Sequence, residues 1–330
     1  MAETEIVVRG LTKDYPRVRA VDNISFEVER KEIFGLLGPN GAGKTTTIRL
    51  LLMLIRPTSG RMSVMGIDSL AHPGKIRQLS GYVPQDVSVD GELTGFENIL
   101  MYSKLYGLPH RGRRGAIDDI LGLLDLRDRA GEMVNTYSGG MMRRLEIAQA
   151  LVNRPKLLFL DEPSIGLDPG AKKVIWGLIR KLRDEFGTIV FINTHDMNEA
   201  DELCDRIGIL TKGRLETIGS PTELKATVGG DILSFDSKAA GFAEHVKALG
   251  YPPLSGSHAE RVDILVTNGE HLIPHILESL KARGVEVEAV SLKKPSLDDV
   301  FLKYTGTRIE AGDSWKEARR TRRTFRRMVK

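Results

Sequence analysis

The sequence has 330 residues, of which 41% are hydrophobic and 28% charged, with a net charge of +4. This balance is typical of a globular protein of about two domains, and it excludes collagen, coiled coil and wholesale disorder. No apolar run approaches the roughly 18–20 residues that span a bilayer. A single cysteine, Cys204, excludes an intrachain disulfide, and acidic residues directly after Ala2 argue against a signal peptide. We therefore expect a cytosolic protein.

The first third of the chain shows strand patterns, then a glycine-rich turn and a helix. Apolar residues alternate over 6–8 and 24–28, as in a half-buried sheet. Ile33–Leu37 is apolar on both faces, as in a parallel sheet, and a helical pattern over Lys44–Ile55 follows the glycines. This order predicts an α/β unit. Further buried strands are expected at Leu157–Leu160 and Ile189–Ile192.

The remaining pattern predicts a helical insert and a second domain. Between Gln85 and Pro155 the chain is mainly helical, and after Gly219-Ser220-Pro221 short strands alternate with helices. We predict a first domain over 1–220 and a small α+β domain of the ferredoxin-like type over 221–305. Its expected elements are Ile232–Phe235, Phe242–Leu249, Val262–Val266, Leu272–Ala282, Val285–Leu292 and Leu297–Tyr304.

A phosphate-binding motif lies between the strand and the helix of the first unit. The run Gly38-Pro39-Asn40-Gly41-Ala42-Gly43-Lys44-Thr45 fits G-x-x-x-x-G-K-[ST] in full. Glycines let successive backbone N–H groups surround phosphate oxygens, and the helix N-terminus adds its positive end. Lys44 brings a charge to the β- and γ-phosphates, and the hydroxyl of Thr45 suits Mg²⁺. The alternative, a glycine-rich turn with an unrelated lysine, does not explain the flanking strand and helix.

Two carboxylates follow the buried strand Leu157–Leu160. Asp161 and Glu162 are thereby placed at the carboxyl edge of the predicted sheet, where ligands of such folds bind. Asp161 suits Mg²⁺, directly or through water, which leaves Glu162 free to take a proton from an attacking water. Apolar runs often end in acids, so this pair gains its meaning from the phosphate loop.

A third motif, Tyr137-Ser138-Gly139-Gly140-Met141, precedes that strand. With the other two it makes the chain resemble the ATP-binding subunits of ABC transporters, which are P-loop NTPases. The resemblance implies an α/β ABC cassette with an antiparallel β subdomain, a helical insert and ATP and Mg²⁺ as cofactors. It also implies that Ser138, Gly139 and Gly140 face the γ-phosphate of ATP held by a second copy, in an ATP-dependent homodimer. Ser138 equally suits a helix cap, and the two roles are compatible.

The resemblance assigns roles to single residues along the chain. Tyr15 matches the aromatic residue that stacks on adenine, and Thr46 extends the ATP-binding set beyond the phosphate loop. Gln85 matches the glutamine that approaches Mg²⁺ and contacts the membrane partner. Asp168 closes the loop that crosses the dimer interface, and His195 matches the histidine at the γ-phosphate. Away from this pattern Tyr15 would be a surface tyrosine, and the other residues would have no assigned task.

The third motif departs from the family pattern at both ends. Tyr137 stands where the family has leucine, and Met141 where it has glutamine. Met141 cannot supply the amide of that glutamine, which the resemblance places near the ribose in the partner's site. Ser138, Gly139 and Gly140 are retained, so we expect the contact with the γ-phosphate to remain.

The end of the second domain indicates which type of ABC cassette the chain resembles. The run Lys294-Pro295-Ser296-Leu297-Asp298-Asp299-Val300-Phe301 is similar to the ending of daunorubicin-resistance type cassettes. That type implies a separately encoded ABC-2 type permease, export of a drug or other hydrophobic compound, and peripheral association with the cytoplasmic face of the cell membrane. One alternative is a soluble, permease-free ABC ATPase acting on ribosomes or nucleic acid. Another is an importer cassette, which the second domain disfavours.

Residues 306–330 are expected to form a linker and a basic tail. From residue 316 onward eight lysines and arginines stand against one glutamate, so the rest of the chain carries a net charge of −3. Ser314 and Glu317 are spaced as in a capping box, which favours a basic amphipathic helix that lies on an anionic membrane or docks in an acidic groove of a partner. A solvated extension is the alternative, and nucleic-acid binding is the least supported. We predict no metal site at His271 and His275, which lack a third ligand, and a packing role for Cys204.

Overall fold

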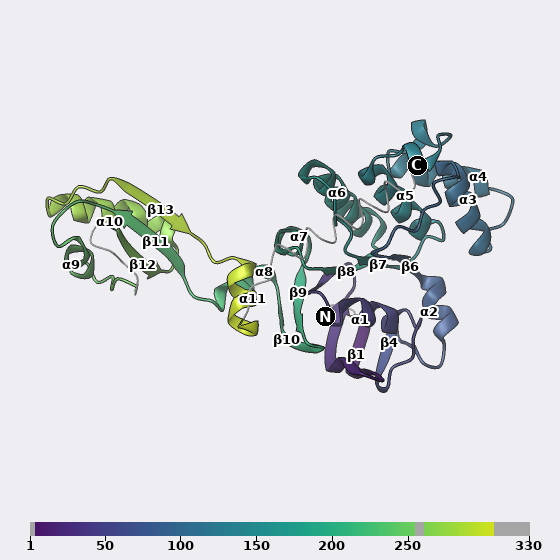
Figure 1. Ribbon diagram of the computed structural model, residues 1–330, viewed down its shortest axis with the longest axis horizontal. Helices are drawn as coiled ribbons and strands as arrows, with labels where there is room; N and C mark the ends of the chain where they lie inside the picture. The colour runs from purple at the N-terminus through teal and green to yellow at the C-terminus, as the bar shows by residue number, and fades with distance from the viewer. Residues whose placement is uncertain (1–3, 255–260, 307–330) are drawn as a thin grey trace. The chain divides into compact units, whose positions relative to one another are not determined.

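The computed structural model describes residues 4–254 and 261–306 of the chain. These residues fold into two compact units, the first running to Pro221 and the second beginning at Thr222 (Figure 1). Each unit has its own sheets and its own hydrophobic core. The expected α/β architecture is confirmed.

A six-stranded sheet forms the centre of the first unit, in the order β10-β9-β3-β8-β7-β6. Its strands run parallel except β10, which pairs with β9 in the antiparallel sense. Strands β3, β7 and β8 are buried along their whole length, because helices cover one face and the second sheet, together with α1, covers the other. The strands are β3 Ile33–Leu37, β6 Ser80–Val83, β7 Leu157–Asp161, β8 Ile189–Thr194, β9 Arg206–Thr211 and β10 Arg214–Gly219.

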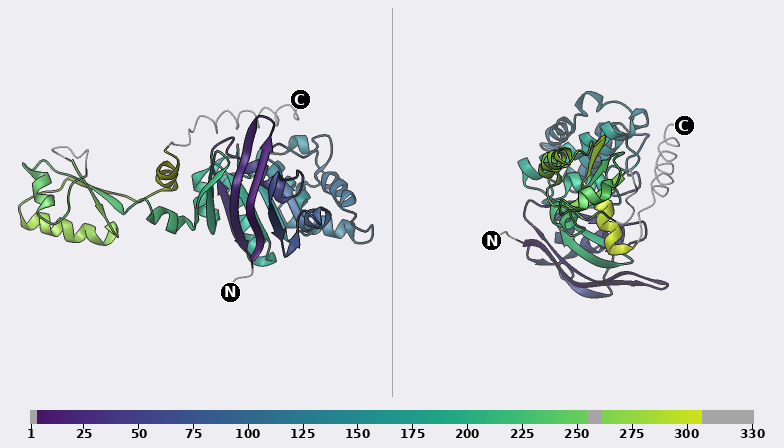
Figure 2. Two further views of the ribbon diagram at one scale, coloured as in Figure 1. Left: turned by 90° about the horizontal axis from the view of Figure 1, so that it is seen from below. Right: turned by 90° about the vertical axis from the view of Figure 1, so that its left-hand side faces the viewer.

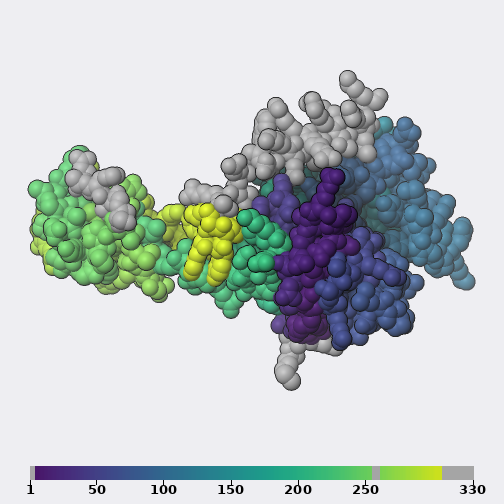
Figure 3. Space-filling view, turned by 60° about the horizontal axis from the view of Figure 1, so that its bottom comes forward, coloured from purple at the N-terminus to yellow at the C-terminus, as the bar shows by residue number. Residues whose placement is uncertain are grey.

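A second, antiparallel sheet of order β2-β1-β4-β5 packs on the first and is the expected β subdomain. Its two longest strands form a hairpin that is visible along one side of the unit in Figures 2 and 3. The core between the sheets includes Phe26 and Phe34, whose rings stack with their centroids 5.4 Å apart. The strands are β1 Thr4–Tyr15, β2 Val18–Glu29, β4 Ser59–Val64 and β5 Ile67–Asp68.

The chain between β6 and β7 is helical, as expected, and its helices group together beyond β6 in Figure 1. Thr94 and Glu97 form a capping box at the start of the first of them. The insert consists of α3 Gly95–Leu105, α4 Arg113–Leu123, the 3-10 turns η1 Arg127–Arg129 and η2 Val134–Thr136, and α5 Gly139–Leu151.

Helices that pack directly on the central sheet complete the first unit. The helix predicted over Lys44–Ile55 is shorter than expected and ends at Leu51, because the chain turns at Met53, which has a φ of 53°. The helices are α1 Lys44–Leu51, α2 Pro73–Leu79, α6 Pro169–Phe186 and α7 Met197–Leu203.

The second unit has a three-stranded antiparallel sheet of order β12-β11-β13. An isolated bridge between Pro253 and Ile264 adds a fourth position beside β12, which completes the ferredoxin-like order that we expected. The strand predicted from Val285 begins at Ala289, because the amide of Val285 still bonds to the end of the preceding helix at Leu280. The elements are α8 Pro221–Ala226, β11 Asp231–Asp236, α9 Phe242–Lys247, β12 Arg261–Val266, α10 Gly269–Ala282, β13 Ala289–Lys293 and α11 Leu297–Thr305.

The predicted basic tail, including Ser314 and Glu317, lies outside the described residues. Within residues 4–254 and 261–306, none of the helices combines the length and the apolar character that a membrane crossing requires.

Candidate functional site

The phosphate loop connects β3 to α1, as the motif predicts. Gly41 and Gly43 have φ angles of 77° and 107°, which residues with side chains rarely adopt. A Cβ atom on Gly43 would also lie 2.3 Å from the carbonyl oxygen of Ala20 on β2. These two glycines therefore permit both the curl of the loop and its close packing against the neighbouring sheet. Gly38 is buried, whereas Asn40 and Gly41 are exposed.

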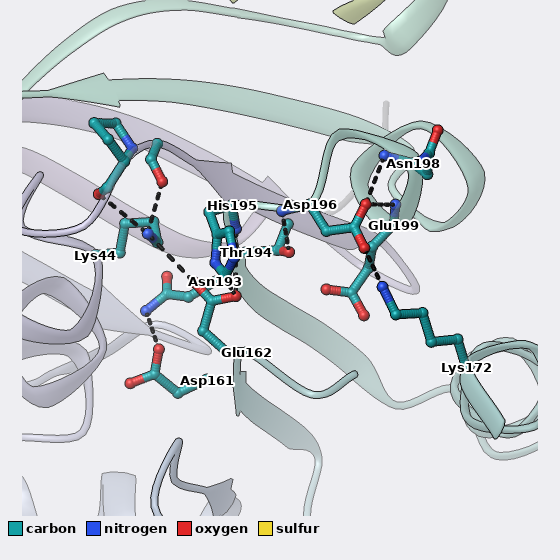
Figure 4. Close-up of polar contacts among 12 residues, drawn as sticks. Lys44, Asp161, Glu162, Lys172, Asn193, Thr194, His195, Asp196, Asn198 and Glu199 are labelled. Carbon is teal, nitrogen blue, oxygen red and sulfur yellow. Dashed lines mark hydrogen bonds and ion pairs between the residues drawn. The ribbon is translucent and has the colours of Figure 1, made fainter. Parts of the chain in front are cut away.

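Lys44 projects from the start of α1 back into the loop (Figure 4). Its Nζ donates to the carbonyl oxygens of Gly38 at 2.7 Å and Pro39 at 3.2 Å, and it lies 3.3 Å from Glu162 Oε1. The side chain is 6% exposed, so its charge is compensated by these acceptors and not by bulk water. Thr45 and Thr46 follow on α1 and are half-buried.

Two polar side chains meet where the adjacent parallel strands β7 and β8 end. Asp161 and Asn193 are register partners, and the side-chain amide of Asn193 donates to Asp161 Oδ1 at 3.1 Å. Asn193 was not predicted as a site residue; the available signal was a polar residue at the end of an otherwise apolar strand. Figure 4 shows the two side chains next to each other, with Asn193 beside Glu162.

The Asp161 carboxylate fits a cation ligand. Its Oδ2 is buried and accepts no hydrogen bond within the described part of the chain, and the same holds for Asn193 Oδ1. Burial raises the pKa of Asp161, because the charged form is poorly solvated there. A nearby divalent cation would stabilise the ionised form, and carboxylate and amide oxygens are the ligands that Mg²⁺ takes. These oxygens therefore fit a magnesium site.

The carboxylate of Glu162 has two side-chain partners, His195 and Lys44. His195 Nδ1 lies 2.8 Å from Glu162 Oε2, and the backbone amide of His195 donates to the same oxygen at 3.3 Å. Burial alone would raise the pKa of Glu162, but the contacts with His195 and Lys44 outweigh it and lower that pKa. Glu162 is thus a buried, ionised carboxylate beside the phosphate loop, as a proton acceptor must be. Its backbone has a φ of 53°, in the left-handed region.

The third motif begins α5. Ser138 is exposed, and its hydroxyl accepts from the amide of Met141 at 3.3 Å, which confirms the capping interpretation. Gly139 and Gly140 are half-buried. An added Cβ on Gly140 would lie 3.3 Å from Ala171 of α6, so this helix start packs closely against the next helix of the same chain.

Three further predicted residues lie at or beside the ends of helices and strands. Asp168 is exposed and caps α6 by accepting from the amides of Gly170 and Ala171 at 3.0 Å each. Gln85 is half-buried in the bend just after β6, the strand beside β7. Tyr15 ends β1, is 38% exposed, and has Lys13 Nζ 5.2 Å from its ring centroid.

The residue that departs from the family pattern at the start of the motif has a structural explanation. Tyr137 is 4% exposed, and its hydroxyl donates to the carbonyl oxygen of Arg129 at 2.6 Å. Room for this hydroxyl exists because residue 95 is glycine: a Cβ there would lie 2.3 Å from Tyr137 Oη. Met141 is half-buried, and nothing in the structure explains its replacement of glutamine.

The remaining candidate residues lie on other elements. Cys204 is buried, with its Sγ 2.5 Å from the position that a Cβ on Gly35 would take, and burial raises its pKa well above the usual value. His271 and His275 both lie on α10, which continues through Pro274.

Comparison with known proteins agrees with this geometry. The profile of a family described as ABC transporter matches residues 21–165, and that of the ATP-binding protein DrrA1-3-like, C-terminal domain, matches residues 219–305. The daunorubicin resistance ATP-binding protein DrrA3 of Streptomyces coeruleorubidus is 38% identical over 310 residues, which are 93% of this chain and 97% of that protein. This chain belongs to the ABC transporter family. Its resemblance to the daunorubicin-resistance type is confirmed.

Two more similarities extend this result. The linearmycin resistance ATP-binding protein LnrL of Bacillus subtilis is 34% identical over 302 residues, covering 90% of this chain and 97% of that protein. A dimeric ATP-binding cassette, solved in a post-hydrolysis state with ADP and phosphate, is 28% identical with a TM-score of 0.59 and covers 65% of this chain and 98% of that one. The chain is therefore an ATPase of the ABC cassette type.

Proposed function

We propose that this chain is the ATP-hydrolysing subunit of an exporter, in which two copies close around two ATP molecules and drive a separately encoded ABC-2 type permease. The cargo is a drug or another hydrophobic compound. The observation that carries this proposal is the similarity to the daunorubicin resistance ATP-binding protein DrrA3. The 38% identity extends over 93% of this chain and therefore through both units. The cassette over 1–220 would bind and hydrolyse ATP, with 221–305 as an accessory domain and 306–330 as a linker and basic tail.

In this proposal ATP binds along the phosphate loop, with adenine on Tyr15. The backbone from Gly38 to Thr46 surrounds the phosphates, and Lys44 contacts the β- and γ-phosphates. Lys44 now bonds to its own loop and to Glu162, so phosphate oxygens would replace some of these acceptors. Binding thereby frees Glu162 from one of its partners.

Three residues would hold Mg²⁺: Thr45, Gln85 and Asp161. The buried, unpaired oxygen of Asp161 supports this assignment. Mg²⁺ held there would supply positive charge that offsets the negative charge developing on the phosphate during hydrolysis.

Hydrolysis would use Glu162 and His195. Glu162 accepts the proton of the attacking water, which its lowered pKa and its place beside the phosphate loop support. His195, whose Nδ1 contacts Glu162, orients that carboxylate and presents the rest of its ring toward the γ-phosphate.

The second copy would complete each site through the exposed face of the third motif. Ser138 and Asp168 are exposed in the single chain and Gly139 and Gly140 half-exposed, so they are available to another molecule. Each copy would offer Ser138, Gly139 and Gly140 to the γ-phosphate held by the other, while Asp168 lies in the loop between the two sites.

The variant Glu162→Gln tests the hydrolytic part. We expect a fall in kcat of about 10²–10⁴-fold, because a positioned base typically contributes that much, with ATP binding retained. Because bound ATP then persists, the variant should elute as a dimer in ATP and as a monomer without it. Glu185→Gln, the same change on the exposed end of α6, is the control and should behave as wild type. A monomeric Glu162→Gln variant at saturating ATP would contradict the proposed dimer.

A pull-down of the intact chain from detergent-solubilised native membranes tests the partner. A co-purifying polypeptide with about six hydrophobic spans of ~20 residues each would support the permease. Such a complex places the chain on the cytoplasmic face of the cell membrane as a peripheral subunit. Recovery with ribosomes, nucleic acid or soluble proteins alone would overturn the exporter proposal in favour of a permease-free ATPase.

A further inference from the structure

The side chain of Arg143, on α5, is buried yet fully hydrogen-bonded. It is 5% exposed, and each of the five N–H groups of its guanidinium has an acceptor at 2.8 to 3.0 Å. Full use of all five donors is what makes a buried guanidinium tolerable. The acceptors are the carbonyl oxygens of Pro84, Asp161, Glu162 and Pro163 and the carboxylate of Glu146.

These acceptors belong to different parts of the site. Pro84 directly precedes Gln85, and the carbonyls of 161–163 follow the end of β7, where Glu162 lies. Arg143 itself is five residues after Ser138, on the helix that Ser138 caps. One side chain therefore joins the loop of Gln85, the backbone of Glu162 and the helix of the third motif.

Glu146 extends this connection one step further. Its Oε2 accepts from Arg143 Nη1 at 2.8 Å, and its Oε1 accepts from the backbone amide of Ser88 at 2.7 Å and the hydroxyl of Ser88 at 3.3 Å. Ser88 is three residues after Gln85, so the loop is held from both sides, at Pro84 and at Ser88. Both carboxylate oxygens of Glu146 are thus paired, and its side chain is 2% exposed.

The backbone of Glu162 has a particular need for such support. Its φ of 53° is unfavourable for a residue with a side chain and persists when surrounding contacts fix it. The amide of Glu162 donates to the carbonyl of Asn193 at 2.9 Å, and its carbonyl accepts from Arg143 Nη2 at 2.9 Å. Since the direction of the carboxylate follows from this backbone, Arg143 contributes to where the carboxylate points.

We propose that Arg143 is a positioning residue for ATP hydrolysis, and that with Glu146 it fixes the Gln85 loop, the Glu162 backbone and α5 relative to one another. A displacement of the Gln85 loop would then move Glu162 and Ser138 together, by a route that does not pass through bound nucleotide. This inference rests on the proposed roles of Gln85, Ser138 and Glu162. Arg143 touches neither nucleotide nor water in this proposal, so it acts through the residues it holds.

The test is Arg143→Lys in the full-length chain, with kcat, KM and the Kd for a fluorescent ATP analogue measured on the same preparation. Lysine keeps the charge but has its donors on one nitrogen and cannot bond to four carbonyls in a plane. We expect kcat to fall about 10- to 100-fold, as for a misplaced catalytic group, with the Kd changed by less than about threefold.

Arg144→Lys is the matched control. Arg144 is the next residue and also donates to carbonyl oxygens, those of Leu124 at 3.0 Å and Asp125 at 3.1 Å, but both acceptors lie within the helical insert. Its variant should lower the thermal midpoint by less than Arg143→Lys does, because Arg144 is 18% exposed and water can satisfy its acceptors, and should leave kcat within about twofold of wild type. Equal effects of the two variants on kcat would overturn the proposal, as would a loss of nucleotide affinity as large as the loss of kcat.

Glu146→Gln provides a second variant that keeps the shape of the side chain, should Arg143→Lys not fold. We expect kcat to fall here too. Where Arg143→Lys does fold, the double variant should lose no more activity than the worse single variant, because both act through the same contacts. Independent, multiplying effects would contradict the proposed connection. Failure of the proposed function is distinguishable: it would appear as full activity in Glu162→Gln, whereas failure of this inference leaves Glu162→Gln inactive and Arg143→Lys active.

Discussion

The two units of the chain differ most in what they bury. The cassette encloses charged side chains at its centre, among them Lys44, Arg143, Asp161 and Glu162, each less than one-tenth exposed. In the part of the second unit that the structure describes, the buried polar side chains are Ser234 and Ser237, and the rest of the interior is apolar. Buried charges are costly unless they are paired, so a unit that retains many of them is organised around a reaction. In its described residues, the second unit is stabilised mainly by apolar packing.

Phe235→Ala should have the largest effect on stability of the variants that test this difference between the units. Phe235 is fully buried on β11, in the core of the second unit. Loss of its ring should cost about 3–5 kcal/mol in the free energy of unfolding of that unit, as for other buried aromatic residues. Limited proteolysis should then cleave the second unit first, while the ATPase kcat stays within about twofold of wild type.

Leu265→Ala, at a residue of β12 that is 50% exposed, is the control for this change and should alter neither property. A large fall in kcat for Phe235→Ala would break the comparison, because it would make the packing of the second unit part of the reaction.

Gly95→Ala should have an intermediate effect, within the cassette. The new Cβ would collide with the hydroxyl of Tyr137, so we expect a loss of about 1–3 kcal/mol in stability, measured by chemical unfolding. Tyr137→Leu removes the hydroxyl and should recover most of this loss in the double variant. Gly107→Ala, at a glycine with open space around it but a φ of 71°, reports the cost of backbone strain without a collision. Additive effects of Gly95→Ala and Tyr137→Leu would show that the two side chains do not compete for this space.

The smallest effect concerns the pH dependence of unfolding. The folded-state pKa of Glu162 is lowered, so its contribution to stability is present above the unfolded-state pKa and is lost as pH falls through the folded-state value. The pKa of Asp161 is raised, so its contribution is present in acid and lost as pH rises through its folded-state value. On acidification Glu162→Gln should therefore lose less stability than wild type, and Asp161→Asn more. Each unit of pKa displacement corresponds to about 1.4 kcal/mol, and identical pH profiles for all three proteins would refute the assignment.

Sequence reasoning succeeded where the signal is local. The spacing of Gly38 to Thr45, and the carboxylates at the end of an apolar strand, predicted the phosphate loop and the position of Asp161 and Glu162 at the sheet edge. The contact between His195 and Glu162 was not predicted; it arises because β7 and β8 are adjacent parallel strands that end at the same edge of the sheet. The features that were predicted are local. These features depend on the order of residues within a few positions of each other.

The residues that were not predicted have roles set by contacts with residues far away in the sequence. Arg143 and Arg144 are adjacent and chemically identical, and nothing local says which one turns inward. The choice depends on carbonyl groups 59 and 20 residues away, at Pro84 and Pro163. Glu146, three residues after Arg143 on the same helix face, was the one available signal. Gly95 likewise has the pattern of an ordinary helix start, and its need for glycine arises from Tyr137.

The left-handed backbone of Glu162 bears on how this protein can be engineered. A residue with a side chain at a φ of 53° costs on the order of 1 kcal/mol relative to glycine. Directed evolution for heat resistance alone would therefore favour glycine or asparagine at position 162, and under the role we propose for Glu162 the variants recovered would bind ATP without turning it over. A library built to stabilise this chain therefore needs a screen for ATP turnover, or a fixed codon at position 162, if the selected variants are to keep ATPase activity.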